Sequence, residues 1–388
     1  MDAHAEIARA IDSYRDKVVA LSHEIHERPE LRFQEHFAAG LLSKAATELG
    51  LEVEREVGGL KTAFRAEFGA KGPAVAILAE YDALPNGHSC GHNLIAGAAL
   101  SAVAGLKSIA GKLPGRVVFL GTPAEEGGGG KIILIDQGAL RGVDAAMMAH
   151  PTDSEYCTMP ALATQHLKLT FHGHGAHAAL APWDGSSALA AVLQTFQSVD
   201  AMRLHLRDGS RIHGIITDGG QAVNIIPERA ECLFLARGKS SKYAKEMGAR
   251  VIRCAEGAAM ATGTRLEHVV EGGYKNLINN LSMAHRYAAH TEALGTKSVE
   301  APENTPTGST DMGDVSHVMP AIHPSFAISR RGEGNCHEDA FVAHADSQRG
   351  YDAMIRVAKA MAMTAYDLLA EPELLAAAKK EFEARKES

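Results

Sequence analysis

The sequence predicts an α/β fold, in which a mostly parallel sheet with helices on both faces carries an inserted α+β domain. Three observations support this prediction. Short apolar runs alternate with segments of helical periodicity in the first part of the chain, the pattern changes to βαββαβ in the middle, and the alternation then resumes. The 388 residues also exceed the size at which one hydrophobic core usually stops growing, so two domains are expected.

The first part of the chain alternates between helix and strand. Residues 4–49 predict two helices, because apolar residues recur at near-helical spacing and Pro29 interrupts the pattern. The elements expected next are strand 74–79, helix 93–110, strand 116–120 and strand 144–149. Strands that alternate with helices usually form a largely parallel sheet with helices packed on both faces.

Residues 165–273 follow a pattern of their own, which we interpret as an inserted domain. Its expected elements are strand 166–172, helix 186–206, strands 211–217 and 229–236, helix 241–262 and strand 265–270. A βαββαβ unit of this kind forms a compact sandwich. The main domain therefore comprises residues 1–164 and 274–388. Its last elements are expected as helix 277–294, strand 325–329 and one long helix over 339–369.

The composition excludes several classes of protein. With 46% hydrophobic and 22% charged residues, the chain can bury a sizeable core and does not resemble a disordered protein. A formal net charge of -8 without a cluster of Lys and Arg argues against a nucleic-acid partner. The N-terminus lacks the features of a signal peptide, and no apolar stretch is long enough to span a membrane. We therefore expect a cytoplasmic protein that binds neither nucleic acid nor membranes.

The cysteines and histidines indicate side-chain chemistry. The 5 cysteines are an odd number and are widely scattered, so they do not form a disulfide framework and act as thiols or thiolates. The 20 histidines are unusually many, and several lie in short Gly-rich segments. This pattern favours metal binding or acid–base chemistry.

Potential metal ligands fall where the predicted strands end. They follow strands 74–79, 116–120, 144–149 and 325–329 or lie in the next loop, and they are Asp82, Cys90, His92, Glu125, Glu126, His150 and His337. Because loops at the carboxyl ends of parallel strands converge, we expect these side chains to cluster at one edge of the sheet. Thiolate, imidazole and carboxylate groups together suit a transition metal ion.

The adjacent carboxylates Glu125 and Glu126 precede four glycines, which would let substrate and backbone approach closely. One carboxylate can bind a metal ion while the other acts as a general base. Taken singly, the motifs have simpler explanations: Cys90 can be a small buried residue, His150 a loop histidine, and His337 a residue at a helix start. Their joint placement at one sheet edge favours a metal site.

Several motifs together resemble a known family. They are Ala79-Glu80-Tyr81-Asp82-Ala83-Leu84-Pro85, Ser89-Cys90-Gly91-His92-Asn93, Glu125-Glu126, His150-Pro151 and Gly173-His174-Gly175-Ala176-His177-Ala178-Ala179. In order and spacing they are similar to the amidohydrolase branch of the dinuclear-metal aminoacylase and carboxypeptidase metallopeptidases. Aminobenzoyl-glutamate hydrolase and the auxin-conjugate amidohydrolases belong to this branch. The resemblance spans about residues 15–365.

The resemblance implies a metallohydrolase domain, an inserted lid that also forms a homodimer, and two divalent metal ions, zinc or manganese, with cobalt as a further candidate. The implied metal ligands, with Cys90 bridging, are Cys90, His92, Glu126, His150 and His337. By the same matching, Glu125 is the general base and Asp82 orients a ligand. His177 helps to polarise the scissile carbonyl, often from the partner subunit, and Asn224 contacts the substrate.

The implied activity is hydrolysis of the amide bond of an N-acyl or aromatic-acyl amino acid, of the aminobenzoyl-glutamate or indoleacetyl-aspartate type, by a metal-activated water. Arg237 is a candidate for binding the substrate carboxylate, although solvation explains a surface arginine equally well. A dipeptidase, a hydrolytic deaminase of an aromatic amine and a catalytically inactive metal-binding scaffold are the alternatives. Asp314, where relatives often carry Asn, and the acidic stretch after His337 leave the exact substrate open.

Overall fold

The computed structural model describes residues 2–386, which fold into two compact units. The first unit comprises the chain up to Pro160, Leu277–Thr305 and the chain from Asp311 onward. The second unit comprises Ala161–Asn276 and the short segment Pro306–Thr310, and residues 165–273 fall inside it. We expected Pro306–Thr310 in the main domain. It joins the second unit because Gly308 O accepts a hydrogen bond of 2.9 Å from Leu162 N.

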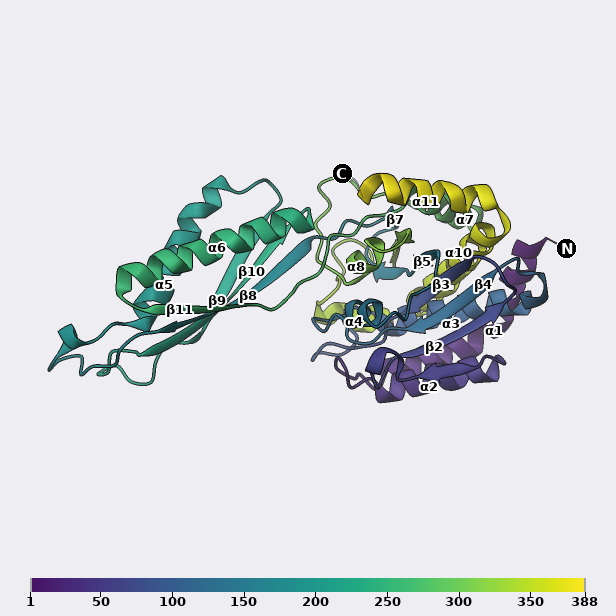
Figure 1. Ribbon diagram of the computed structural model, residues 1–388. Helices are drawn as coiled ribbons and strands as arrows, with labels where there is room; N and C mark the ends of the chain where they lie inside the picture. The colour runs from purple at the N-terminus through teal and green to yellow at the C-terminus, as the bar shows by residue number, and fades with distance from the viewer. Residues whose placement is uncertain (1, 387–388) are drawn as a thin grey trace. The chain divides into compact units, whose positions relative to one another are not determined.

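A six-stranded sheet forms the centre of the first unit (Figure 1). Its order is β1 (Val53–Arg55), β2 (Phe64–Gly69), β4 (Arg116–Gly121), β3 (Ala74–Ala79), β5 (Ala145–Met147) and β13 (Ala321–Ile322). The pairs from β4 to β13 are parallel, whereas β1 and β2 add two antiparallel strands at one edge. All residues of β3 are fully buried, so both faces of the sheet are covered there. The predicted mostly parallel sheet is confirmed, and β1 and β2 are additions to it.

The helices of the first unit pack around this sheet. They are α1 (Ala3–His26), α2 (His36–Glu48), α3 (His92–Ser108), α4 (Gly130–Asp136), α7 (Leu281–Ala293), α8 (Met312–Ser316), α9 (Asp339–Ala345), α10 (Gln348–Ala370) and α11 (Pro372–Lys386). Helix α3 contacts α1, α10 and strand β3. Its small residues permit this close packing: a Cβ on Gly97 would lie 2.3 Å from Met354 Sδ.

The prediction of one long helix over 339–369 is wrong. Helix α9 ends at Ala345, and α10 begins at Gln348. The break has a local cause, because Ser347 has extended backbone and its hydroxyl accepts a hydrogen bond of 3.0 Å from Gly350 N. A side chain that caps the first turn in this way starts a new helix.

Short strands of the first unit form a second small sheet. Its order is β12 (Val299–Glu300), β7 (Tyr156–Thr158), β14 (Ser325–Ala327) and β6 (His150–Thr152). Strand β14 pairs in parallel with β6, so that Ser325 lies opposite His150. This pairing fixes the backbone of His150.

The second unit has the predicted βαββαβ order and an antiparallel sheet. The sheet order is β11 (Arg265–Val270), β8 (Ala163–His172), β10 (Arg229–Gly238) and β9 (Arg211–Asp218). Helices α5 (Ala188–Met202) and α6 (Ser241–Thr262) pack on each other and on this sheet. Alternate residues of β10 face the helices in a separate core, including Cys232 and Phe234. No helix within residues 2–386 is long and apolar enough to cross a membrane.

Candidate metal centre

The loops after the strands of the first unit bring the predicted ligands together. Cys90 precedes α3, and His92 is the first residue of that helix. Glu125 and Glu126 follow β4, His150 begins β6, and the remaining ligand candidate lies between β14 and α9. Since β3 and β4 are parallel neighbours, their carboxyl ends meet at one edge.

The backbone at this edge is unusual at three positions. Gly91, between Cys90 and His92, has φ of 71°, and a Cβ there would lie 2.6 Å from Pro151 Cγ, so the turn requires glycine. Ala124 and His337 have φ of 61° and 73°, values that are uncommon for residues with a side chain. Such conformations concentrate at functional sites, where the surrounding structure holds them.

The ligand atoms form overlapping groups, in each of which the atoms lie within 4.8 Å of one another. One group consists of Cys90, His92 and Glu126, a second of Cys90, His150 and Cys336, and a third of Glu80, His92 and His150. His337 joins the cluster through its Nε2 atom, which lies 3.3 Å from Glu126 Oε1. The structure thus brings the five predicted ligands into one cluster.

The surroundings of His92 fit a metal ion. Its ring is fully buried, and Nδ1 lies 3.0 Å from Asp82 Oδ1. Asp82 Oδ2 accepts a hydrogen bond of 2.9 Å from Glu126 N. His92 Nε2 and Glu126 Oε1 are both buried and make no hydrogen bond within the described chain. A carboxylate on one ring nitrogen and an available lone pair on the other is the usual arrangement of a metal-binding histidine.

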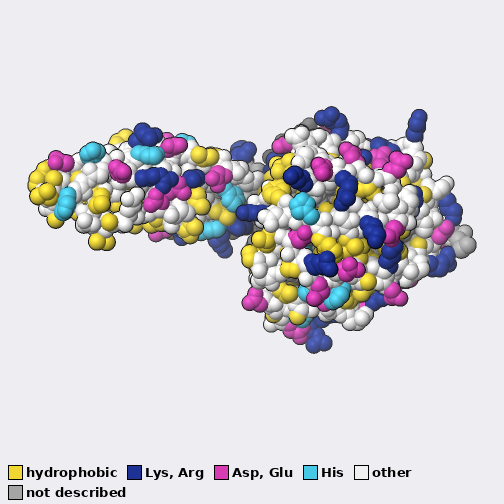
Figure 2. Space-filling model, turned by 90° about the horizontal axis from the view of Figure 1, so that it is seen from below, with side chains coloured by type: hydrophobic (Ala, Val, Ile, Leu, Met, Phe, Trp, Pro, Cys, Tyr) yellow, Lys and Arg dark blue, Asp and Glu magenta, His cyan; other side chains and the backbone are white. Residues whose placement is uncertain are grey.

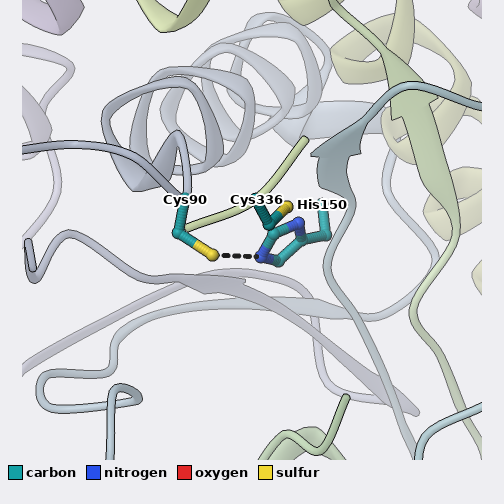
Figure 3. A group of neighbouring side chains, drawn as sticks. All are labelled: Cys90, His150 and Cys336. Atoms are coloured by element: carbon teal, nitrogen blue, oxygen red, sulfur yellow. Dashed lines mark hydrogen bonds between the residues drawn. The ribbon is translucent and has the colours of Figure 1, made fainter. Parts of the chain in front are cut away.

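Cys336 is a member of the cluster that was not predicted from the sequence. Figure 3 shows it beside His150, whose Nε2 lies 3.6 Å from Cys90 Sγ. A hydrogen bond between the two thiols lowers the pKa of Cys336, opposed by burial, and raises the pKa of Cys90. The pair therefore shares a proton. Its position directly before His337 was the only signal in the sequence.

The environments of Glu125 and Glu126 differ. Burial, together with the nearby charges of Glu80 and Asp311, raises the pKa of Glu125 well above its usual range. Burial also acts on Glu126, but a hydrogen bond from His337 and the charge of His92 lower its pKa. Carboxyls whose pKa values are pushed apart in this way commonly take different roles, one as proton carrier and one as anion.

The second unit contains the other predicted site residues. His177 and Asn224 are neighbours there, because His177 bridges Ile225 and Ala178 N donates a hydrogen bond of 3.0 Å to Asn224 O. His177 Nδ1 accepts from Leu180 N at 3.1 Å. Arg237 is half-buried on β10, and its Nη1 donates to Ser309 Oγ at 3.0 Å. Burial lowers the pKa of Arg237.

Comparisons with known proteins agree with this arrangement. Residues 76–360 match the model of peptidase family M20/M25/M40. The chain is 39% identical to a Xaa-Arg dipeptidase of Mus musculus, covering 97% of this chain and 91% of the relative. It is 29% identical to a p-aminobenzoyl-glutamate hydrolase subunit of Escherichia coli, covering 94% and 92%.

A solved structure shares the fold. The dinuclear metal-binding M20 peptidase of Bacillus subtilis superimposes with a TM-score of 0.74 at 20% identity, covering 92% of this chain and 99% of that one. The family match extends over most of the chain, including both predicted domains, and all five predicted ligands lie within it. The chain therefore belongs to peptidase family M20/M25/M40 and is a metal-dependent hydrolase.

Proposed function

We propose that this protein hydrolyses the amide bond of a small substrate whose leaving group is an amino acid with a free carboxylate, using two divalent metal ions. The observation that carries the proposal is the convergence of two imidazole groups, a thiol and a carboxylate beside the buried Glu125. Among substrates, the 39% identity to a Xaa-Arg dipeptidase favours dipeptides. The weaker identity to the aminobenzoyl-glutamate hydrolase subunit keeps aromatic-acyl amino acids as the second class.

The metal ions would be held by residues from different loops, namely Cys90, His92, Glu126, His150 and His337. When bound, they supply Lewis acidity that polarises a water molecule and the scissile carbonyl. Zinc or manganese suits a mixed set of imidazole, thiolate and carboxylate ligands, and cobalt can replace them. Asp82 keeps the ring of His92 in the orientation and tautomer that leave Nε2 available.

Glu125 is the residue that moves the proton. Its carboxylate accepts a proton from the attacking water and returns it to the leaving amine. The raised pKa of Glu125, caused mainly by burial, supports both halves of this exchange, because proton transfer is most efficient when the pKa of the carrier is near the working pH.

The second unit would complete the site. We propose that the His177 imidazole donates a hydrogen bond to the oxyanion that develops at the scissile carbonyl. Asn224, which is adjacent to His177, would contact the substrate, and the Arg237 guanidinium would bind the substrate carboxylate. The half-burial of Arg237 strengthens such an ion pair, since less water competes for the guanidinium.

We also propose that the second unit forms a homodimer. Strands β9 and β11 are the two edges of its sheet, and unpaired edges require cover in a water-exposed protein. The outer side chains include Ile215, which is 62% exposed on β9, and Val270, which is 49% exposed on β11. Figure 2 shows hydrophobic side chains at the surface of this unit. Because the Escherichia coli relative is one subunit of its hydrolase, a mixed oligomer is the alternative outcome.

A panel of matched substrates tests the proposed activity. We expect metal-loaded protein to cleave dipeptides that end in Arg or Lys, and to cleave their C-terminal amides much more slowly because the carboxylate is lost. The panel should include aminobenzoyl-glutamate and indoleacetyl-aspartate, with the Glu125→Gln variant as the control for contaminating peptidases. Release of ammonia from aminoaromatic acids, without cleavage of any of these amides, would instead support the deaminase.

A further inference from the structure

A buried lysine lies between two carboxylates next to the candidate metal centre. Lys131 Nζ contacts Glu80 Oε1 and lies 2.7 Å from Asp311 Oδ1, and Lys131 N donates to Asp311 Oδ2 at 2.9 Å. The three side chains are at most 1% exposed. Buried charges need such complete pairing, because leaving one unpaired costs several kcal/mol, roughly 3–5.

The second oxygen of Glu80 is not used by this cluster. Glu80 Oε2 is buried and has no hydrogen-bond partner within residues 2–386. It faces His92 Nε2 at 3.7 Å, and that nitrogen is also buried and makes no hydrogen bond within the same residues. Both atoms belong to the group that Glu80 forms with His92 and His150.

This contact is unfavourable unless a cation lies between the two atoms. His92 donates its Nδ1 proton to Asp82, so a neutral ring carries a lone pair on Nε2. A lone pair and a carboxylate oxygen then face each other in a buried site, and such an arrangement repels. Metal ions bind imidazole nitrogen and carboxylate oxygen at about 2.0–2.2 Å, which places two ligands of one ion about 3.3–3.7 Å apart. The separation between Glu80 and His92 fits this range.

We propose that Glu80 is a further metal ligand, which binds through Oε2 the same ion as His92 and His150. Lys131 and Asp311 are positioning residues in this arrangement, because they hold Glu80 Oε1 and thereby aim Oε2 at the ion. The inference rests on the proposed metal centre. It gives that ion a carboxylate ligand in addition to imidazole and thiolate, and Lys131 offsets part of the added negative charge.

The competing explanation is that Glu80 serves only as a counter-ion for Lys131. Two variants separate these roles, Glu80→Gln and the matched control Asp311→Asn. Each removes one negative charge beside Lys131 and preserves the size of the side chain. A counter-ion role therefore predicts similar effects of both substitutions, whereas a ligand role predicts that only Glu80→Gln changes the metal site directly.

Cobalt(II) titration of the metal-free proteins, followed by visible absorption, measures this difference. We expect Glu80→Gln to weaken one of the two cobalt ions by at least 10-fold, the lower end of losses seen when even outer-shell partners are removed, and to change the absorption spectrum. Asp311→Asn should keep the spectrum of the unsubstituted protein. Equal effects of the two variants, or an unchanged Glu80→Gln spectrum with both affinities retained, would overturn the proposal.

A measurement on the unsubstituted protein avoids any folding defect of the variants. In a crystal structure of the zinc-loaded full chain, Glu80 Oε2 should lie about 2.0–2.2 Å from a zinc ion. A longer separation with water between the two atoms would refute the ligand role while leaving the proposed function intact. If the unsubstituted chain bound no cobalt or zinc at all, the proposed metal centre would fail together with Glu80.

Discussion

Glu125 and Glu126 are adjacent in the sequence but have opposite shifts in pKa. Burial and neighbouring carboxylates raise the pKa of Glu125, while contacts with His337 and His92 outweigh burial and lower that of Glu126. The difference arises because the strained turn at Ala124 sends the two side chains into different surroundings. A base and a ligand can therefore occupy consecutive positions.

The pair gives a prediction about division of labour. Glu125→Gln should lower turnover by about 10²–10⁴-fold, the usual contribution of a general base, and leave the metal content nearly unchanged. Glu126→Gln should lower the metal content, because it removes a ligand. Elemental analysis and amide-hydrolysis rates of the two purified variants check this. The reverse pattern would exchange the two assignments.

At the residue scale, the sequence could predict the ligand candidates that follow strands. Cys90, His92 and His150 come after apolar runs, and parallel pairing brings such positions to one edge. It could not predict Glu80 or Cys336. Each is next to a candidate in the same motif, and only the backbone angles decide which side chains point into the cluster. The positive φ of His337, for example, cannot be read from its neighbours.

At the scale of elements, periodic segments were predictable and short ones were not. The strand at Ala74–Ala79 and the helix at Ser241–Thr262 have the predicted bounds, because their apolar patterns are long and clear. Strands β6, β7 and β12 have at most three residues each, which is too few to show a period. The break before α10 depends on the hydrogen bond of one capping serine rather than on hydropathy.

Helix α1 is attached to α10 and α7 by a network around Asp367 that should make stability depend on pH. His4 Nε2 lies 2.6 Å from Asp367 Oδ1, and His290 Nε2 and Arg286 Nη1 each lie 2.7 Å from Oδ2. Burial alone would raise the pKa of Asp367, but these hydrogen bonds lower it to about 2. A lowered pKa stabilises the folded state above the unfolded pKa, and this stabilisation is lost as the pH falls through the folded pKa.

We predict that the Asp367 network contributes about 2 kcal/mol to the free energy of unfolding near neutral pH. This contribution should disappear between about pH 4 and pH 2, the interval between the unfolded and folded pKa values. Urea denaturation of the unsubstituted protein and of Asp367→Asn at several pH values measures it. The two curves should converge at acid pH, and a constant difference down to pH 2 would contradict the prediction.

At the scale of the whole molecule, the proposed site needs residues from both units. Glu125 lies in the first unit and His177 in the second. The predicted homodimer through the second unit would allow one subunit to supply His177 to the metal site of its partner. Neither the sequence nor the order of elements decides between a shared and a self-contained site.

Subunit exchange distinguishes these two arrangements. His177→Ala and Glu125→Gln should each be inactive alone, but a mixed dimer with shared sites contains one site with both Glu125 and His177. We therefore expect activity to return after mixing, with exchange verified by differently tagged subunits. Verified exchange without recovered activity would disprove the shared site, and a monomeric mass in solution would disprove the dimer.

The central claim, that amide hydrolysis depends on the metal ions held by the cluster around Cys90, is tested most directly by removing those ions. Protein dialysed against a chelator, with metal content checked by elemental analysis, should lose hydrolysis of its best amide substrate. Activity should return on addition of zinc, manganese or cobalt, and the Cys90→Ala variant should not recover. Full amide hydrolysis by protein shown to be free of metal would contradict this claim.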